Sequence, residues 1–280
     1  ILEFLAVRKL NPKADNQIIC LVGPPGIGKT SIVEGLAYRI QRGEIPDVLK
    51  DYRVIKLSTS AMIGVDPVTG EAKIQILLDE LKNETNLILF IDEVHTLIGG
   101  SDDGPMDLAN ILKPALDRGD VKAIGATTTE EYETYVIRDR AFLRRFDRID
   151  VLEPDHETTV KILIGSIPRI AAKTGTDFKY TDYIVEELMS SIVEATSEYK
   201  RVYGLAAMYP DVALSVLSQA FSNALYDNRD NVNVLDVYNA IKNSKRIYPD
   251  AIIKELTKFK EKFATEGALE GAMDHFIQFL

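Results

Sequence analysis

The sequence predicts an α/β fold, in which a domain built on a parallel five-stranded sheet is followed by a small α-helical domain. In the first half of the chain, short apolar runs alternate with amphipathic stretches, which is typical of parallel strands joined by crossover helices. After the Glu-Pro-Asp segment at 153–155, the strand-like runs stop and only helical periodicity continues. We therefore expect domains at residues 1–153 and 154–250, with a C-terminal helical extension at 251–280.

The individual elements follow from the same patterns. Five short apolar runs predict the strands: Ile18–Val22, Val54–Leu57, Leu87–Ile91, Val121–Ala126 and Ile149–Leu152. In the second half, apolar residues with helical spacing predict helices at 156–173, 180–196, 207–226, 233–244 and 249–265. The segment Tyr209-Pro210-Asp211 is turn-like and stands near the start of one of these helices.

Composition narrows the class of protein. Hydrophobic residues make up 46% of the 280 residues and charged residues 27%, which is typical of a globular protein. No apolar run reaches the roughly 18 residues that a membrane span needs, so we expect no membrane association and a cytoplasmic location. The net charge of −10 opposes sequence-independent binding to nucleic acid. Because the chain begins at Ile1 rather than at a methionine, we expect it to be a piece of a longer protein.

A phosphate-loop motif follows the first predicted strand. Its pattern is a glycine, any four residues and then Gly-Lys-Thr, and it lies between an apolar run and a helical stretch, as the motif requires. The glycines let backbone N–H groups surround phosphate oxygens, and the helix that begins there adds the positive end of its dipole. The expected nucleotide-binding residues are Gly23, Pro24, Pro25, Gly26, Ile27, Gly28, Lys29, Thr30 and Ser31.

The last residues of this loop predict ATP and Mg²⁺ as cofactors. Lys29 would reach the β and γ phosphates, and the Thr30 hydroxyl would ligate Mg²⁺, which keeps most of its shell as water and phosphate oxygen. The alternative, a glycine-rich turn that binds nothing, accounts for the glycines but not for Lys29 and Thr30 at this place.

Two adjacent carboxylates end the third predicted strand. Neighbouring residues on a strand point in opposite directions, so we expect Asp92 and Glu93 to have different tasks. Asp92 is placed to hold Mg²⁺ through water, and Glu93 is placed to polarise the water that attacks the γ-phosphate. The alternative is an ordinary strand end with solvated acids.

The fourth predicted strand ends in the hydroxyls of Thr127 and Thr128, one of which is placed to bridge the attacking water and the γ-phosphate. The alternative is that these threonines cap the helix that begins near Glu130.

Further along, Arg144 and Arg145 are adjacent. An arginine offered to a neighbouring subunit's γ-phosphate would stabilise transition-state charge, whereas the alternative is a surface basic pair.

The stretch from Gly23 to Phe146 closely resembles the first ATPase module of the Clp unfoldase and disaggregase family, the ClpB type, within the AAA+ ATPases. The strings that carry this resemblance lie at 29–40, 88–97, 110–119, 125–132 and 143–146. The resemblance implies a P-loop AAA+ sheet domain, a helical lid that closes over the nucleotide, and a homo-oligomeric ring, usually hexameric, that acts on a protein substrate. It implies Glu93 as the catalytic acid, Thr128 as the sensor, and Arg144 and Arg145 as fingers that reach the next subunit.

The same resemblance places Ile162 and Pro210 in the adenine pocket of the lid. Two positions depart from the family pattern. Residues 62–71 stand where the family has a pore loop with an aromatic residue, and this segment has none, so Ile63 or Val68 would grip a threaded chain poorly. Val212 stands where a basic residue is common. We therefore keep, beside a protein unfoldase, the alternative of an ATP-gated switch that assembles or remodels a partner complex without threading.

Overall fold

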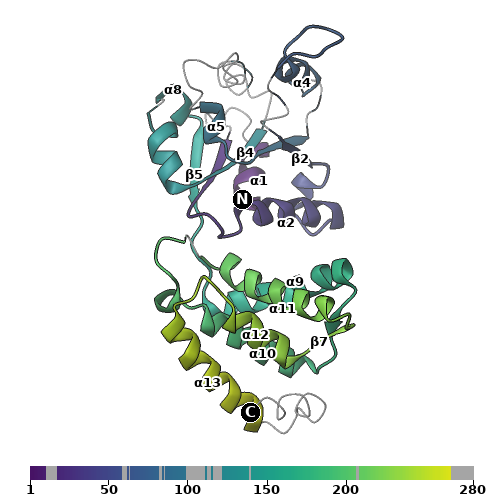
Figure 1. The fold of residues 1–280 in the computed structure, drawn as a ribbon. Helices are drawn as coiled ribbons and strands as arrows, with labels where there is room; N and C mark the ends of the chain where they lie inside the picture. The colour runs from purple at the N-terminus through teal and green to yellow at the C-terminus, as the bar shows by residue number, and fades with distance from the viewer. Residues whose placement is uncertain are drawn as a thin grey trace. The chain divides into compact units, whose positions relative to one another are not determined.

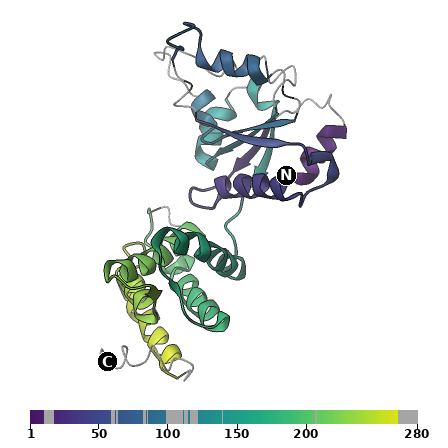
Figure 2. The same cartoon turned by 90° about the vertical axis from the view of Figure 1, so that its right-hand side faces the viewer.

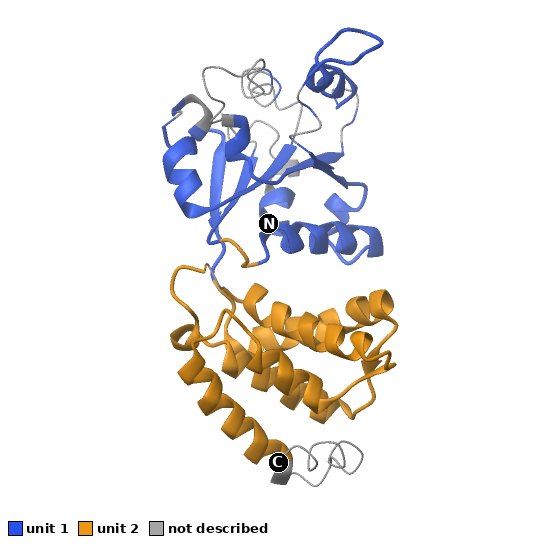
Figure 3. Cartoon of the chain, in the orientation of Figure 1, with its two compact units in different colours: residues 1–24, 28–152 blue, residues 25–27, 153–280 orange. Residues whose placement is uncertain are grey.

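The computed structural model of the 280-residue chain describes residues 1–10, 18–58, 62, 64–81, 84, 86–98, 111, 115, 122–138, 140–205 and 208–265 (Figure 1). The chain divides into two compact units (Figure 3). Unit 1 comprises residues 1–24 and 28–152, and unit 2 comprises residues 25–27 and 153–280. The predicted domain limits at 153, 250 and 251 stay predictions.

Unit 1 is built on a parallel five-stranded sheet with the strand order β2-β3-β4-β1-β5. Its strands are β1 (Ile18–Val22), β2 (Arg53–Leu57), β3 (Leu87–Ile91), β4 (Lys122–Thr127) and β5 (Phe146–Asp150). The sheet confirms the predicted fold class. Strands β1, β3 and β4 are buried almost throughout because both of their faces are covered, and this explains their nearly continuous apolar sequences.

Helices cover both faces of this sheet (Figures 1 and 2). One face packs against α1 (Leu2–Leu10), α2 (Lys29–Arg42) and the short helix η1 (Asp47–Leu49). The other face packs against α4 (Lys73–Leu81), α5 (His95–Ile98) and the π-helix η2 (Tyr132–Val136). The short helices α7 (Thr129–Glu131) and α8 (Arg140–Leu143) precede β5.

Strand β1 illustrates the two faces. Ile19 and Leu21 point to the α2 side, whereas Ile18, Cys20 and Val22 point to the α4 side, because alternate strand residues face opposite ways. Burial raises the pKa of the Cys20 thiol to about 12, so this cysteine is an inert core residue, as its apolar surroundings in the sequence predict.

The prediction of the fifth strand at Ile149–Leu152 is wrong, because the strand runs from Phe146 to Asp150. β5 is an edge strand that pairs with β1, and beyond its first residue its side chains are only partly buried or exposed. Its sequence therefore lacks the continuous apolar run that marks a central strand. The fourth predicted strand is displaced by one residue at its end, and Val121 lies outside the described residues.

Unit 2 is mainly helical, as predicted. Its helices are α9 (His156–Thr174), α10 (Asp182–Ala195), η3 (Glu198–Lys200), α11 (Asp211–Tyr226), α12 (Val234–Lys242) and α13 (Pro249–Thr265). The expectation that strands stop after residue 155 is wrong, because β6 (Asp177–Phe178) and β7 (Asn231–Val232) form a parallel pair. Strands of two residues are too short to show a sequence period.

One apolar core holds these helices together. It includes Leu188 of α10, Phe221 of α11 and Val237 of α12, all of them fully buried. Helix α13 adds Phe259 and Phe263 to the same core. None of the described helices combines the length and the apolar character that crossing a membrane requires.

Candidate functional site

The predicted site residues of unit 1 follow the carboxyl ends of three neighbouring strands. The phosphate loop follows β1, Asp92 follows β3, and Thr128 follows β4. Because β1 pairs with β4 and β4 pairs with β3, these ends meet at one edge of the sheet. This edge is where open α/β sheets bind their ligands.

Two glycines of the phosphate loop have backbone conformations that side chains disfavour. Gly26 has φ 80° and Gly28 has φ 88°, both in the left-handed region. Gly28 is the residue before α2, and it has no side chain that would cap the helix. The first turn of α2 also carries no acidic residue. The N-terminus of α2 is therefore suited to receive an anion.

Lys29 lies in the first turn of α2. Its ammonium donates hydrogen bonds to the carbonyl oxygens of Gly23, at 2.6 Å, and of Pro24, at 2.7 Å. Partial burial lowers the pKa of Lys29, although the charges of Glu131 and Asp92 oppose this shift. The structure thus holds a partly buried cation against the loop.

Thr30 and Asp92 are in direct contact. The Thr30 hydroxyl donates to Asp92 Oδ2 over 3.0 Å, so residues 62 positions apart in the sequence meet at one point. The same oxygen lies 3.4 Å from Nζ of Lys56, which comes from β2. One oxygen of Asp92 therefore contacts both Thr30 of α2 and Lys56 of β2.

The expectation that Asp92 and Glu93 both lie on a strand is wrong, because β3 ends at Ile91 and the two acids form the turn that follows. Glu93 has φ 53°, a left-handed conformation that is rare for residues other than glycine. Its backbone carbonyl accepts from the Thr96 hydroxyl at 2.8 Å, and its side chain is exposed. The two carboxylates have different surroundings in this turn, because Asp92 contacts Thr30 whereas the Glu93 side chain is exposed.

Thr128 caps α7, as the structural alternative predicted. Its hydroxyl accepts from the Glu131 N–H at 3.2 Å, and Glu131 Oε2 accepts from the Thr128 N–H at 3.0 Å. The adjacent Thr127 is buried and donates to the same Glu131 oxygen at 3.1 Å. His95 Nδ1 lies 3.1 Å from both Thr127 Oγ1 and Glu131 Oε2. The threonines thus belong to a local hydrogen-bonded cluster, and the sensor role of Thr128 stays a prediction.

The other predicted site residues lie on separate elements. Arg144 and Arg145 occupy the turn between α8 and β5, where Arg144 is exposed and Arg145 is partly buried. In unit 2, Ile162 is a partly buried residue of α9, and Pro210 is the buried residue that precedes α11. The predicted roles of these four residues are not tested by their positions.

The chain matches the model of the ATPase family associated with various cellular activities (AAA) over residues 19–153. It is 41% identical to the chaperone protein ClpB of Aquifex aeolicus over 203 residues, which are 71% of this chain and 19% of ClpB. It is 36% identical to heat shock protein 100 of Trypanosoma brucei brucei over 89% of this chain and 28% of that protein. This chain belongs to the AAA family of ATPases. The sequence resemblance to the Clp group is thereby confirmed.

Solved structures agree with this family membership. The AAA ATPase chain matches Hsp104 in a closed-state reconstruction with ATPγS and FITC casein, with 31% identity and a TM-score of 0.67 over 86% of this chain and 41% of that one. It matches the Hsp104-ADP complex of S. cerevisiae with 30% identity and a TM-score of 0.64 over 96% of this chain and 43% of that one. The chain spans less than a third of the length of the curated relatives named above.

The residues of this AAA ATPase fit Mg-ATP. A threonine hydroxyl and a carboxylate 3.0 Å apart are hard oxygen donors of the kind that Mg²⁺ takes when phosphate supplies other ligands. The half-buried Lys29 ammonium and the uncapped start of α2 supply positive charge beside them. These groups come from α2, which follows β1 and the phosphate loop, and from the turn after β3. Strands β1 and β3 both pair with β4 in the same sheet.

Sequence reasoning about the AAA ATPase site missed three residues. Lys56 contacts Asp92, and Glu131 organises the two threonines. Gly125 lets the turn after β3 approach β4, since a Cβ there would lie 3.0 Å from a Val94 methyl carbon. Of these, only Glu131 carried a sequence signal, because Thr-x-x-Glu before a helix predicts a capping box.

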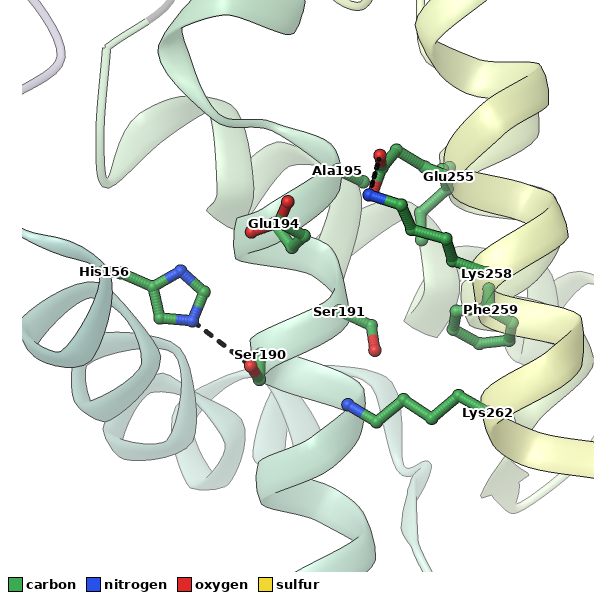
Figure 4. A pocket seen from close by; sticks show the side chains of 10 residues that line it. His156, Ser190, Ser191, Glu194, Ala195, Glu255, Lys258, Phe259 and Lys262 are labelled. Atoms are coloured by element: carbon green, nitrogen blue, oxygen red, sulfur yellow. Dashed lines mark hydrogen bonds and ion pairs between the residues drawn. The ribbon is translucent and has the colours of Figure 1, made fainter. Parts of the chain in front are cut away.

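A cavity of about 340 Å³ lies within unit 2 of the AAA ATPase chain and is lined by residues of α9, α10, α12 and α13 (Figure 4). Its basic side chains have partners inside the unit: Lys258 pairs with Glu255, Lys262 pairs with Glu187, and His156 pairs with Ser190. Each of these three basic side chains therefore already has a partner within unit 2, and none of them requires a ligand. The strand edge of unit 1 is the stronger site.

Proposed function

We propose that the chain binds Mg-ATP at the loop Gly23–Thr30 and hydrolyses it with Glu93 as the residue that polarises the attacking water. The observation that carries this proposal is the 3.0 Å contact between Thr30 and Asp92. Thr30 and Asp92 are far apart in the sequence and are both predicted to hold Mg²⁺, and they meet at the start of α2. A glycine-rich turn or a solvated strand end, taken alone, would not require this contact.

The residues divide the chemistry among them. Backbone N–H groups at the start of α2 and the Lys29 ammonium bind and orient the β and γ phosphates. Thr30 and Asp92 hold Mg²⁺, which when bound neutralises charge on the phosphates. Glu93 accepts a hydrogen bond from the attacking water. Its side chain is exposed, and the contact with Thr30 is made by the neighbouring Asp92 instead. Thr128 completes the orientation of that water.

The site is completed, in this proposal, by a second copy of the chain. Arg144 and Arg145 stand on a turn at the surface of unit 1, and Arg144 is exposed. An arginine from a neighbouring subunit would stabilise the charge that develops on the γ-phosphate. We therefore propose a homo-oligomeric, hexameric ring, with Ile162 and Pro210 of unit 2 contributing to the adenine pocket. The cytoplasmic location and the lack of nucleic acid binding stay predictions from composition.

We propose that the ring converts hydrolysis into mechanical work on proteins, as a Clp-type unfoldase or disaggregase module. The relatives named ClpB, heat shock protein 100 and Hsp104 support this assignment.

A specific observation favours the second candidate, an ATP-gated remodelling switch. The segment that stands at the pore-loop position forms a hairpin closed by a bridge between Val65 and Ala72. Asp66 Oδ1 accepts from the backbone of Val68 and Thr69, which fixes the turn. The exposed apolar tip is Val68, at 89% exposure, which offers an aliphatic side chain where an aromatic one would grip a chain more firmly. Ile63 lies outside the described residues.

Two variants test the nucleotide site. Lys29→Ala should abolish binding of a fluorescent ATP analogue, because the cation held against the loop is lost. Glu93→Gln should bind the analogue normally and lose turnover by a factor of about 10² or more. Analogue binding that survives in Lys29→Ala would refute the phosphate-loop assignment, and steady-state turnover that survives in Glu93→Gln would refute the catalytic one.

Two further experiments test the ring and its work. Arg144→Ala should lose ATPase activity in samples that sedimentation shows to be oligomeric, and normal activity there would refute the finger role. The full-length protein should unfold a tagged fluorescent protein in an ATP-dependent manner. Persistent fluorescence beside active hydrolysis would favour the remodelling switch over the unfoldase.

A further inference from the structure

Lys56 is a basic residue beside the metal-binding position to which neither the motifs nor the family resemblance assigns a role. It lies on the edge strand β2, in register with Phe90 of β3. Its Nζ lies 5.6 Å from the centroid of the Phe90 ring and 3.4 Å from Oδ2 of Asp92. The side chain therefore runs along the sheet toward the carboxylate that follows β3.

The Asp92 oxygen that Lys56 approaches is the one that accepts from Thr30. The Thr30 hydroxyl donates to Oδ2 at 3.0 Å, so one carboxylate oxygen serves a hydroxyl and an ammonium together. Thr30 is also the proposed ligand of Mg²⁺, and Asp92 is proposed to hold the metal through water. A Mg²⁺ ion that binds beside Thr30 and Asp92 approaches the Lys56 ammonium, which already contacts Asp92. The two positive charges repel each other at this distance.

The exposure of the pair makes this contact easy to exchange. The side chains of Lys56 and Asp92 are 55% and 34% exposed, so water screens their attraction. An ion pair of this kind contributes little to stability and breaks readily. It is strong enough to orient a carboxylate but weak enough to yield to a divalent cation.

We infer that Lys56 is a positioning residue that competes with Mg²⁺ for Asp92. It holds the carboxylate beside Thr30 before the metal arrives, and it is displaced when Mg²⁺ binds with ATP. The consequence is that the site requires a higher concentration of free Mg²⁺ than Thr30 and Asp92 alone would need. This inference rests on the proposed function of the same site.

A different role for the same lysine gives opposite results. If the Lys56 ammonium bound a phosphate instead, its removal would weaken nucleotide binding without Mg²⁺ as well as with it. If it competes for Asp92, its removal leaves Mg²⁺-free binding unchanged and makes Mg²⁺ more effective. Nucleotide affinity measured with and without the metal therefore separates the two roles.

The experiment uses the 280-residue chain and the variant Lys56→Met. Affinity for a fluorescent ATP analogue is measured in excess chelator and then at increasing free Mg²⁺. We expect affinity in chelator within about twofold of the unaltered chain. We also expect a two- to fivefold lower Mg²⁺ concentration at half-maximal effect, which corresponds to about 0.4–1 kcal/mol and lies in the range of an exposed ion pair. Lys56→Arg, which keeps the charge, should restore the unaltered Mg²⁺ dependence.

Arg53→Met is the matched control. Arg53 lies on the same strand and pairs with Glu84 at 2.6 Å, away from Asp92, so its loss changes the net charge equally and should leave the Mg²⁺ dependence unaltered. An unchanged Mg²⁺ midpoint in Lys56→Met, or weaker binding in chelator, would overturn the inference. Failure of the unaltered chain to bind the analogue at saturating Mg²⁺ would instead overturn the proposed function.

Discussion

Glu93 shows how a single residue can carry backbone strain at a candidate catalytic position. Its φ of 53° places it in the left-handed region, which costs a residue with a Cβ roughly 1–2 kcal/mol. Strain of this kind persists where surrounding structure fixes the backbone, and here the Thr96 N–H and hydroxyl both donate to the Glu93 carbonyl. These hydrogen bonds fix the backbone of Glu93 in the turn that follows β3.

We predict that Glu93→Gly stabilises the fold while it removes hydrolysis. Glycine relieves the left-handed strain but adds flexibility to the unfolded chain, so the net gain should be about 0.5 kcal/mol. Urea unfolding measures the gain, and a steady-state assay measures the loss of turnover. Asn228→Gly is the control, since Asn228 has φ 54° in unit 2 and its replacement should leave turnover intact. A less stable Glu93→Gly variant would contradict the strain argument.

A second residue, Glu131, makes the stability of the folded chain depend on pH. Burial pushes the pKa of Glu131 upward, but hydrogen bonds from Thr128 and Thr127 and the nearby His95 outweigh it and hold the pKa below its usual value. A carboxyl with a lowered pKa in the folded state contributes stability above its unfolded pKa, near pH 4.3. That contribution is lost as the pH falls through the lower folded value.

We predict that Glu131→Gln lowers the unfolding free energy at pH 7 by about 1 kcal/mol, because charge-assisted hydrogen bonds become neutral ones. The deficit should shrink in acid, where the unaltered carboxyl also becomes neutral. Urea unfolding at pH 7 and pH 3.5 tests this prediction, with Glu130→Gln as the control at the adjacent exposed carboxylate. An equal deficit at both pH values would show that the charge of Glu131 is not responsible.

At the scale of elements, the site depends on how closely the turn after β3 approaches β4. The Val94 N–H donates to the Ala126 carbonyl at 3.0 Å, and the Val94 side chain is fully buried against Gly125. A Cβ at Gly125 would lie 3.0 and 3.1 Å from two Val94 carbons, closer than packed carbons tolerate. The absence of a side chain at this strand position therefore sets the place of Asp92.

We predict that Gly125→Ala destabilises unit 1 by about 1–3 kcal/mol through overpacking and reduces ATP affinity, because the turn that carries Asp92 must shift. Val94→Ala removes the opposing methyl groups. In the double variant the two changes should compensate by about 1 kcal/mol relative to their sum. Strict additivity in a double-mutant cycle would show that the contact with Val94 is not the cause.

At the scale of the whole molecule, each unit has its own core. The core of unit 2 consists of residues between Val160 and Phe263, whereas the two cores of unit 1 lie on the faces of the sheet. Unit 2 also has an ion pair of its own, in which the buried Arg201 lies 2.6 Å from Oε1 of the partly buried Glu153, and that oxygen accepts from the Tyr209 N–H. Independent cores are the mark of domains that can fold alone.

We predict that residues 153–265 fold without the rest of the chain and unfold cooperatively in urea. Within this fragment, Arg201→Met should cost about 3 kcal/mol, because it leaves the partly buried Glu153 without its cation. Circular dichroism measures both results. Lys179→Met, which breaks an exposed pair with Asp230, is the control and should change stability by less than about 1 kcal/mol. A gradual, non-cooperative loss of helix would contradict an independent unit.

The sequence by itself determined the α/β class, the positions of the central strands and the helices of unit 2, because these depend on periods and turn residues that neighbouring positions carry. It also identified the loop at Gly23–Thr30 and the acids at Asp92 and Glu93, since their spacing is local. Their roles stay predictions.

Only the tertiary structure decided how these pieces meet. The position of β5, the β6–β7 pair and the contact of Lys56 with Asp92 depend on segments distant in the sequence. Side chains at an edge strand or in a two-residue strand obey no strong period, because burial there is partial and is imposed by the neighbouring strand rather than by the segment itself. The fold thus places the residues of the local motifs relative to one another, and it brings Lys56 into contact with Asp92.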